Sequence, residues 1–165
     1  MNQFFAEFFG TAMILVFGCG VVANVLMNKT KGNNSGWIVI TFGWAVGVFT
    51  GVLISAPVSG AHLNPAVTLA LAIAHKFSWS LVPLYVCAQV LGAMFGAGLV
   101  WLAYKKHFDA TDDADSKLAV FSTIPNIRSY WYNVITEVIG TYVLALAVLY
   151  MAEPEVGLGA LNALP

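Results

Sequence analysis

Long apolar stretches separated by short polar segments make up most of the chain. Four of them cover approximately residues 4–27, 37–56, 81–104 and 131–151. Each has about the 20 residues that an α-helix needs to cross roughly 30 Å of hydrocarbon. The pattern therefore predicts an all-α membrane protein with four spanning helices. A fifth apolar segment begins at Leu158, shortly before the last residue, Pro165.

The segment "SGAHLNPAV" at residues 59–67 lies between the second and third stretches and interrupts the apolar pattern. Asn64 is a good helix N-cap, and Pro65 suits the first helical position. The apolar run from Asn64 to Ala74 reaches roughly 16 Å, about half of the hydrocarbon thickness. The preceding "SAPVSGAHL" contains a proline and a glycine, so we expect non-helical backbone there, buried in protein or lining a water-filled cavity. The sequence thus predicts a re-entrant half-helix over about residues 59–75.

Composition and charge exclude several classes of protein. Hydrophobic residues make up 59% of the chain and charged residues 9%, whereas soluble domains carry roughly 25% charged residues. The net charge of −1 provides no basic face for nucleic acid. Cys19 and Cys87 lie inside apolar stretches without a metal-ligand spacing, so we interpret them as packing thiols and expect no metal and no cofactor.

A short internal repeat places an acid near the start of two spans. "EFFGT" at 7–11 and "EVIGT" at 137–141 share Glu, Gly and Thr, and an ionised acid inside a membrane helix costs roughly 2.5–3.5 kcal/mol or more unless it is partnered. Recurrence after three spans indicates inverted repeats, with residues 1–130 as the first repeat and 131–165 as the start of a second. We expect Glu7, Gln89 and Glu137 to brace re-entrant backbone; a proton relay through the acids is the alternative.

The segment "SGAHLNPAV", together with "AEFFGT" before it, resembles the first half of the major intrinsic protein family of aquaporins and glycerol facilitators. Asn64, Pro65 and Ala66 match the family's Asn-Pro-Ala box. The resemblance covers essentially the whole chain, but the family's second box and the arginine that follows it are missing. It implies a right-handed bundle of inverted repeats, a homotetramer with one pore per protomer, and a multi-pass location in the plasma or inner membrane.

Three further matches point to the glycerol-conducting branch. Trp44 precedes Asn64 by 20 residues, as does the constriction tryptophan of glycerol facilitators; "FSTIPN" at 121–126 is similar to an aquaglyceroporin loop; and Tyr104 matches a tyrosine typical of that branch. The resemblance implies a passive channel for glycerol, similar small neutral polyols and water that excludes ions and protons.

The resemblance also assigns roles along the pore. Asn64 presents its amide to the solute, and Gly60, Ala61, His62 and Leu63 present successive backbone carbonyls. Trp44 forms an apolar side of the constriction. This asymmetry suits glycerol, because a solute hydroxyl left without a partner costs about 1–3 kcal/mol. The positive end of the half-helix dipole disfavours hydronium.

Three alternatives remain at this point: a water-selective aquaporin, a half-size secondary transporter that dimerises, and a membrane enzyme using Glu7, His62 or Glu137. The transporter needs a coupling-ion site, and no span carries the Asp, Lys or Arg groups that such sites often use. For an enzyme we find no nucleophile–base pair at useful spacing and no cofactor motif. The sequence therefore favours a channel that is not an enzyme.

The topology that the resemblance implies conflicts with the charge distribution. It places the N-terminus and residues 75–76 in the cytoplasm, and residues 28–36 and 105–130 outside. Six of the seven basic residues then lie outside, namely Lys29, Lys31, Lys105, Lys106, Lys117 and Arg128. This is the reverse of the usual positive-inside tendency.

Overall fold

The computed structural model describes residues 1–150. Within this range the elements are α1 (Gln3–Leu26), α2 (Trp37–Ser59), α3 (Pro65–Ile73), a short 3₁₀ turn η1 (Trp79–Leu81), α4 (Val82–Asp109), α5 (Ala114–Ala119) and α6 (Tyr130–Tyr150), and there is no strand. Helices α1, α2, α4 and α6 are long and apolar enough to cross a membrane. The predicted all-α membrane fold with four spans is confirmed. Residue 151 and the expected fifth segment from Leu158 lie outside the described residues.

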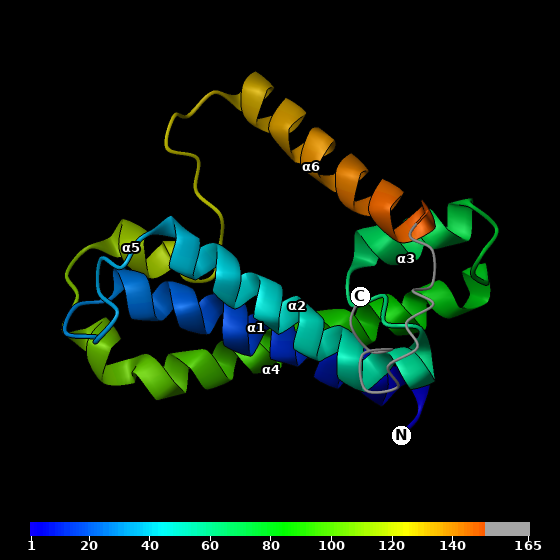
Figure 1. Cartoon of the computed structure of the whole chain (residues 1–165), viewed down its shortest axis with the longest axis horizontal. Helices are drawn as coiled ribbons and strands as arrows, with labels where there is room; N and C mark the ends of the chain where they lie inside the picture. The colour runs from blue at the N-terminus through cyan, green and yellow to red at the C-terminus, as the bar shows by residue number, and fades with distance from the viewer. Residues whose placement is uncertain (151–165) are drawn as a thin grey trace, which may run out of the picture.

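Helix α1 lies between α2 and α4 and packs along both of them (Figure 1). Many residues of α1 are buried. The small residues among them allow the backbones of α2 and α4 to approach α1 closely. Helix α3 contacts α4 and α6. Helix α6 runs apart from the three-helix bundle, and none of its residues is buried (Figure 1). The packed core of the described chain is therefore α1, α2 and α4.

Glycines set the distance between α1 and α4. A Cβ atom at Gly92 would lie 2.2 Å from the carbonyl oxygen of Phe8, and one at Gly96 would lie 2.5 Å from that of Ala12. Both distances are shorter than a van der Waals contact, and in both cases the obstructing atom belongs to the α1 backbone. The two helices can pack this closely only because α4 has no side chain at these positions.

Gly92→Ala is expected to destabilise the bundle, because the new methyl group forces α4 away from α1. Overpacking of this kind costs about 1–3 kcal/mol, and more when backbone must move. Gly98→Ala is the matched control on the same helix, since a Cβ there has nothing within 4 Å. It should leave stability unchanged or raise it by up to about 1 kcal/mol through helix propensity. Thermal unfolding of both variants in detergent checks the difference, and equal melting temperatures would contradict the packing argument.

Two boundaries differ from the sequence expectation. Helix α2 continues through Pro57 to Ser59, so the expectation of non-helical backbone over all of "SAPVSGAHL" is wrong for its first five residues. A proline can lie in a membrane helix where neighbouring groups satisfy the freed backbone. Non-helical backbone is confined to residues 60–64, and the half-helix itself is Pro65–Ile73 rather than the full 59–75.

The expected external loop over about 105–130 is partly helical. Helix α4 extends to Asp109, with Lys106 and His107 in its last turn, where cations favour the helix dipole. Helix α5 then begins after Asp113, whose carboxylate accepts hydrogen bonds from the backbone N–H groups of Asp115 and Ser116. A side-chain hydrogen bond from Ser116 is the main reason that the pKa of Asp113 is lowered. This cap stabilises the start of α5, which contacts α1.

Candidate pore site

The carboxylate of Glu7 lies at the centre of a buried network and has no exposed surface. Its Oε1 atom accepts hydrogen bonds from the hydroxyl of Ser59 at 2.6 Å and from the backbone N–H of His62 at 3.0 Å. Its Oε2 atom accepts from the backbone N–H of Leu63 at 2.7 Å and from the amide of Gln89 at 2.8 Å. One side chain of α1 thus joins the end of α2, the non-helical segment and α4.

The segment held by Glu7 has an unusual backbone conformation. Gly60, Ala61 and Leu63 have φ angles of 80°, 51° and 53°, in the left-handed region. For a residue with a Cβ atom this costs roughly 1–2 kcal/mol. The hydrogen bonds to Glu7 occupy two N–H groups of this segment, and they stabilise a conformation that the sequence alone disfavours.

The backbone carbonyls of this segment differ in their partners. Those of Gly60, Ala61 and His62 accept no hydrogen bond from any residue in the range 1–150. The carbonyl of Leu63 accepts a long hydrogen bond of 3.5 Å from the Thr11 hydroxyl. A carbonyl oxygen has two lone pairs, so all four residues can still accept a hydrogen bond from a solute.

Asn64 caps α3, as its sequence position indicates. Its side-chain oxygen accepts from the backbone N–H of Ala66 at 2.7 Å, and Pro65 is the first helical residue. Its backbone carbonyl accepts from the N–H of Thr68 at 3.0 Å and from the Thr68 hydroxyl at 3.1 Å. The Asn64 amide nitrogen forms no hydrogen bond within residues 1–150, so its two N–H donors can bind a solute.

The ring of His62 is buried and packed between aromatic side chains. Its centroid lies 4.5 Å from that of Phe77 and 4.7 Å from that of Tyr85. Its Nδ1 atom lies 3.1 Å from the hydroxyl of Thr68. The imidazole is thus held inside the protein. The backbone carbonyl is the group of His62 that remains available to a solute.

Trp44 lies near the opposite end of α2, about 22 Å along the helix from Ser59 at ~1.5 Å per residue. Its ring lies against Gly18, where a Cβ atom would be 2.3 Å from the indole. The half-buried indole lines a hollow of about 510 Å³ between α1, α2 and residues 113–126. The structure therefore separates Trp44 from the Glu7 network along the axis of the bundle.

In the described chain, Glu137 belongs neither to the Glu7 network nor to the hollow beside Trp44. It is exposed on α6 and forms no hydrogen bond with any residue from 1 to 150. Its proposed bracing role concerns a loop that the family resemblance places after Pro165. That role stays a prediction.

Sequence reasoning missed three polar residues of the network. The Ser59 hydroxyl donates to Glu7, the Thr68 hydroxyl accepts from Gln89 at 2.9 Å, and the Tyr85 hydroxyl donates to the Ser59 carbonyl at 2.8 Å. Each is buried within or beside an apolar stretch. A buried polar group needs a partner, so this placement was the available signal, although it does not identify the partner.

Comparison with known proteins decides the family. A profile described as "Major intrinsic protein" matches residues 1–164. The chain belongs to the major intrinsic protein family. A probable glycerol uptake facilitator protein of Thermotoga maritima is 53% identical over 149 residues, which is 90% of this chain and 64% of that protein. A glycerol uptake facilitator protein of Streptococcus pneumoniae is 46% identical over 161 residues, or 96% of this chain and 69% of that protein.

A solved structure of the same family has a similar fold. The X-ray structure of the aquaglyceroporin from Plasmodium falciparum superposes with a TM-score of 0.60 at 37% identity, covering 65% of this chain and 43% of that chain. Compared with the two facilitators named in the previous paragraph, the chain spans about two thirds of their length. It has the multi-pass membrane fold of the major intrinsic proteins, a family of channels and facilitators.

Proposed function

We propose that this chain forms one wall of a passive channel for glycerol and similar small neutral polyols, and that water also passes. Residues 1–130 make the first repeat, and residues 131–165 begin the second. The channel is a homotetramer in the plasma or inner membrane, with no nucleic-acid partner and no enzymatic activity. The observation that carries the proposal is the segment Gly60–Asn64, with its carbonyls and one amide available next to the start of a half-helix.

The geometry supports conduction of hydroxyl-bearing solutes in a simple way. The carbonyls of Gly60, Ala61, His62 and Leu63 accept hydrogen bonds from successive hydroxyl groups as the solute sheds its water. The Asn64 amide, with Pro65 and Ala66 completing the box, then donates to a solute oxygen. Each hydroxyl finds a partner at every step, which avoids the cost of about 1–3 kcal/mol for a hydroxyl left unpaired. The N-terminal end of α3 adds a positive potential that opposes cations.

Trp44 is the residue that favours glycerol over a water-selective pore. Its indole presents a broad apolar face to the hollow between α2 and residues 113–126, against which the carbon backbone of a polyol can slide. The close relatives named above are glycerol uptake facilitators, in agreement with this choice. The alternative for Trp44 is an interfacial anchor, which is common for Trp in membrane proteins.

Trp44→Ala in the complete channel is expected to widen the constriction, admit larger polyols and reduce discrimination among them. Stopped-flow swelling of proteoliposomes in glycerol, ribitol and sorbitol measures the ratios. Trp101→Ala is the matched control, because Trp101 is an exposed indole on α4. It should change the amount of folded protein without changing the ratios. Unchanged permeability ratios in Trp44→Ala would remove Trp44 from the constriction, and flux that needs an ion gradient would favour the secondary transporter.

A further inference from the structure

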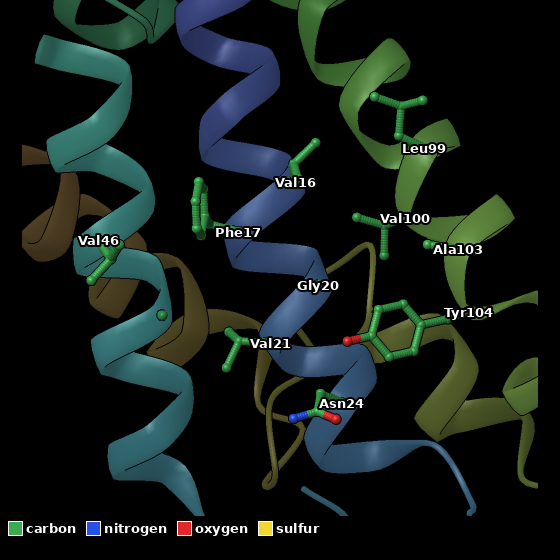
Figure 2. A pocket seen from close by; sticks show the side chains of 11 residues that line it. Val16, Phe17, Gly20, Val21, Asn24, Val46, Leu99, Val100, Ala103 and Tyr104 are labelled. Atoms are coloured by element: carbon green, nitrogen blue, oxygen red, sulfur yellow. The ribbon is translucent and has the colours of Figure 1, made fainter. Parts of the chain in front are cut away.

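A groove of about 580 Å³ runs along α1 between α2 and α4 (Figure 2). Its walls are apolar, formed mainly by Val16, Phe17 and Gly20 of α1 and Leu99 and Val100 of α4. From Val16 to Asn24 the groove extends roughly 12 Å along the helix, and one leaflet of hydrocarbon is about 15 Å deep. The groove is therefore nearly as long as one leaflet is deep, and its walls are apolar like the acyl chains of that leaflet.

One end of the groove is polar. The Tyr104 side chain points from α4 toward α1, and the Asn24 amide lies beside it on the last turns of α1 (Figure 2). Among residues 1–150, neither the Tyr104 hydroxyl nor the Asn24 amide takes part in a hydrogen bond. Both residues lie near the ends of spanning helices, where Tyr is enriched at the membrane–water interface. Two free donors thus lie at the depth of a lipid headgroup.

Basic side chains follow directly beyond this polar end. A Cβ atom at Gly32 would lie 2.3 Å from the Asn24 amide, so the loop that carries Lys31 folds over that end. Lys106 lies one helical turn after Ala103, which lines the groove. Both lysines are exposed, and neither forms an ion pair within the described chain.

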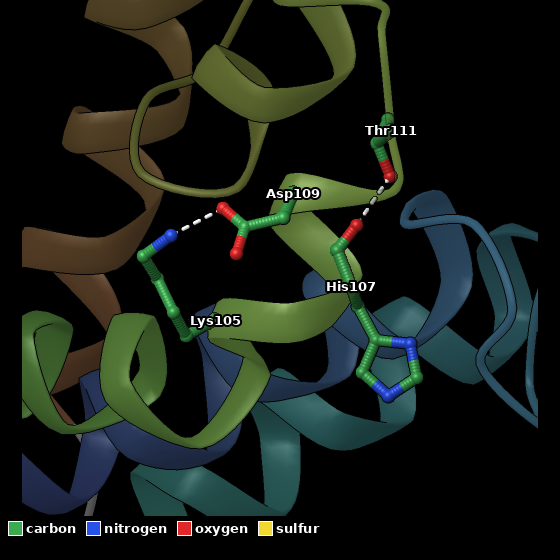
Figure 3. A network of polar contacts seen from close by, with 4 residues as sticks. All are labelled: Lys105, His107, Asp109 and Thr111. Atoms are coloured by element: carbon green, nitrogen blue, oxygen red, sulfur yellow. Dashed lines mark hydrogen bonds and ion pairs between the residues drawn. The ribbon is translucent and has the colours of Figure 1, made fainter.

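Lys105 and Asp109 lie in the last turns of α4, and Asp109 is one helical turn after Lys106. They form an ion pair with each other, and the His107 ring points away from them (Figure 3). This pairing neutralises one acid near the end of α4. Within residues 1–150, Lys31 and Lys106 form no ion pair.

The acids at the start of α5 face a different cavity. Asp113 and Asp115 line the hollow beside Trp44, together with Leu15 and Cys19 of α1. At 3.6 residues per turn, these α1 positions lie roughly opposite to the groove positions around Gly20. Asp113 and Asp115 are therefore on the far side of α1, whereas Lys31 and Lys106 lie at the polar end of the groove.

We propose that this groove binds an anionic phospholipid. One acyl chain lies along α1 between α2 and α4, and the phosphate group accepts hydrogen bonds from Tyr104 and Asn24 beside Lys31 and Lys106. The proposal gives a role to basic residues that the positive-inside tendency leaves unexplained. It does not depend on which solute the channel conducts.

Lipid binding by the purified chain tests the proposal, with dioleoyl phosphatidylglycerol and dioleoyl phosphatidylcholine as probes and native mass spectrometry as the readout. Each basic residue near an anionic headgroup strengthens binding roughly fivefold, so two lysines give a preference of about 25-fold for the anionic lipid. The double variant Lys31→Gln/Lys106→Gln should lose most of this preference. The control Lys117→Gln removes one positive charge from α5 and should retain the preference.

A second pair of variants tests the groove itself. A Cβ atom at Gly20 would meet nothing closer than the Val100 side chain at 3.9 Å, so Gly20→Ala should fold normally and weaken lipid binding less than a larger side chain. Gly20→Leu fills the groove and should weaken retention of phosphatidylglycerol. Equal binding of both lipids, or an equal loss in Lys117→Gln, would overturn the proposal. So would a change of oligomeric state in Gly20→Leu with lipid binding unchanged, because a second copy of the chain would then occupy the groove.

Discussion

Glu7→Ala should collapse the segment Gly60–Asn64 of this chain and, in the complete channel, abolish solute conduction. The substitution removes the acceptor of four hydrogen bonds, two of them from the backbone N–H groups of His62 and Leu63. Each buried donor left unsatisfied costs about 1–3 kcal/mol, so the two backbone groups alone account for roughly 2–6 kcal/mol. That is a large part of the ~5–15 kcal/mol by which proteins are stable. Thermal unfolding in detergent and glycerol swelling of proteoliposomes measure the two effects.

Glu7→Gln is the informative companion of this substitution. The amide keeps one oxygen that can accept, but its NH₂ group faces a backbone N–H donor, so we expect an intermediate loss of stability. Glu137→Gln in the same chain should change unfolding little, since Glu137 is exposed and makes no hydrogen bond within residues 1–150. If Glu7→Ala melts and conducts like the unsubstituted protein, the carboxylate does not support the segment.

Liposomes that contain only residues 1–165 are expected to swell in glycerol no faster than protein-free liposomes. The carbonyls of Gly60, Ala61 and His62 have no protein partner in the described chain, and α6 has no buried residue to form an opposite wall. Polar backbone exposed to lipid costs several kcal/mol per group, so a pore with one wall does not stay open. A full-length relative reconstituted at the same density is the control. Equal swelling by the two proteins would refute the need for a second repeat.

The spans and the half-helix could be predicted because their signals are local. Apolar length alone marks α1, α2, α4 and α6, and the pair Asn64–Pro65 marks the start of α3. The continuation of α2 beyond Pro57 was not predictable in this way. It depends on tertiary partners: Ser59, the last residue of α2, donates to Glu7, and its carbonyl accepts from Tyr85.

The site could be predicted less completely than the fold. The presence of Glu7 in an apolar helix indicates that it needs partners, but the sequence does not say that Gln89 and Ser59 are among them, because these residues are 82 and 52 positions away. The positive φ angles of Ala61 and Leu63 were also hidden, since neither residue type favours that conformation. Interactions between distant segments decide both features.

The long sequence separations within the Glu7 network also have a consequence for membrane insertion. When α1 first enters the bilayer, the partners of its carboxylate have not yet been synthesised, and Gln89 comes 82 residues later. At about 5–20 residues per second, a ribosome needs roughly 4–16 s to reach it. During this interval an ionised Glu7 would lie unpaired in hydrocarbon. Newly made α1 is therefore expected to remain beside the translocon until α4 arrives.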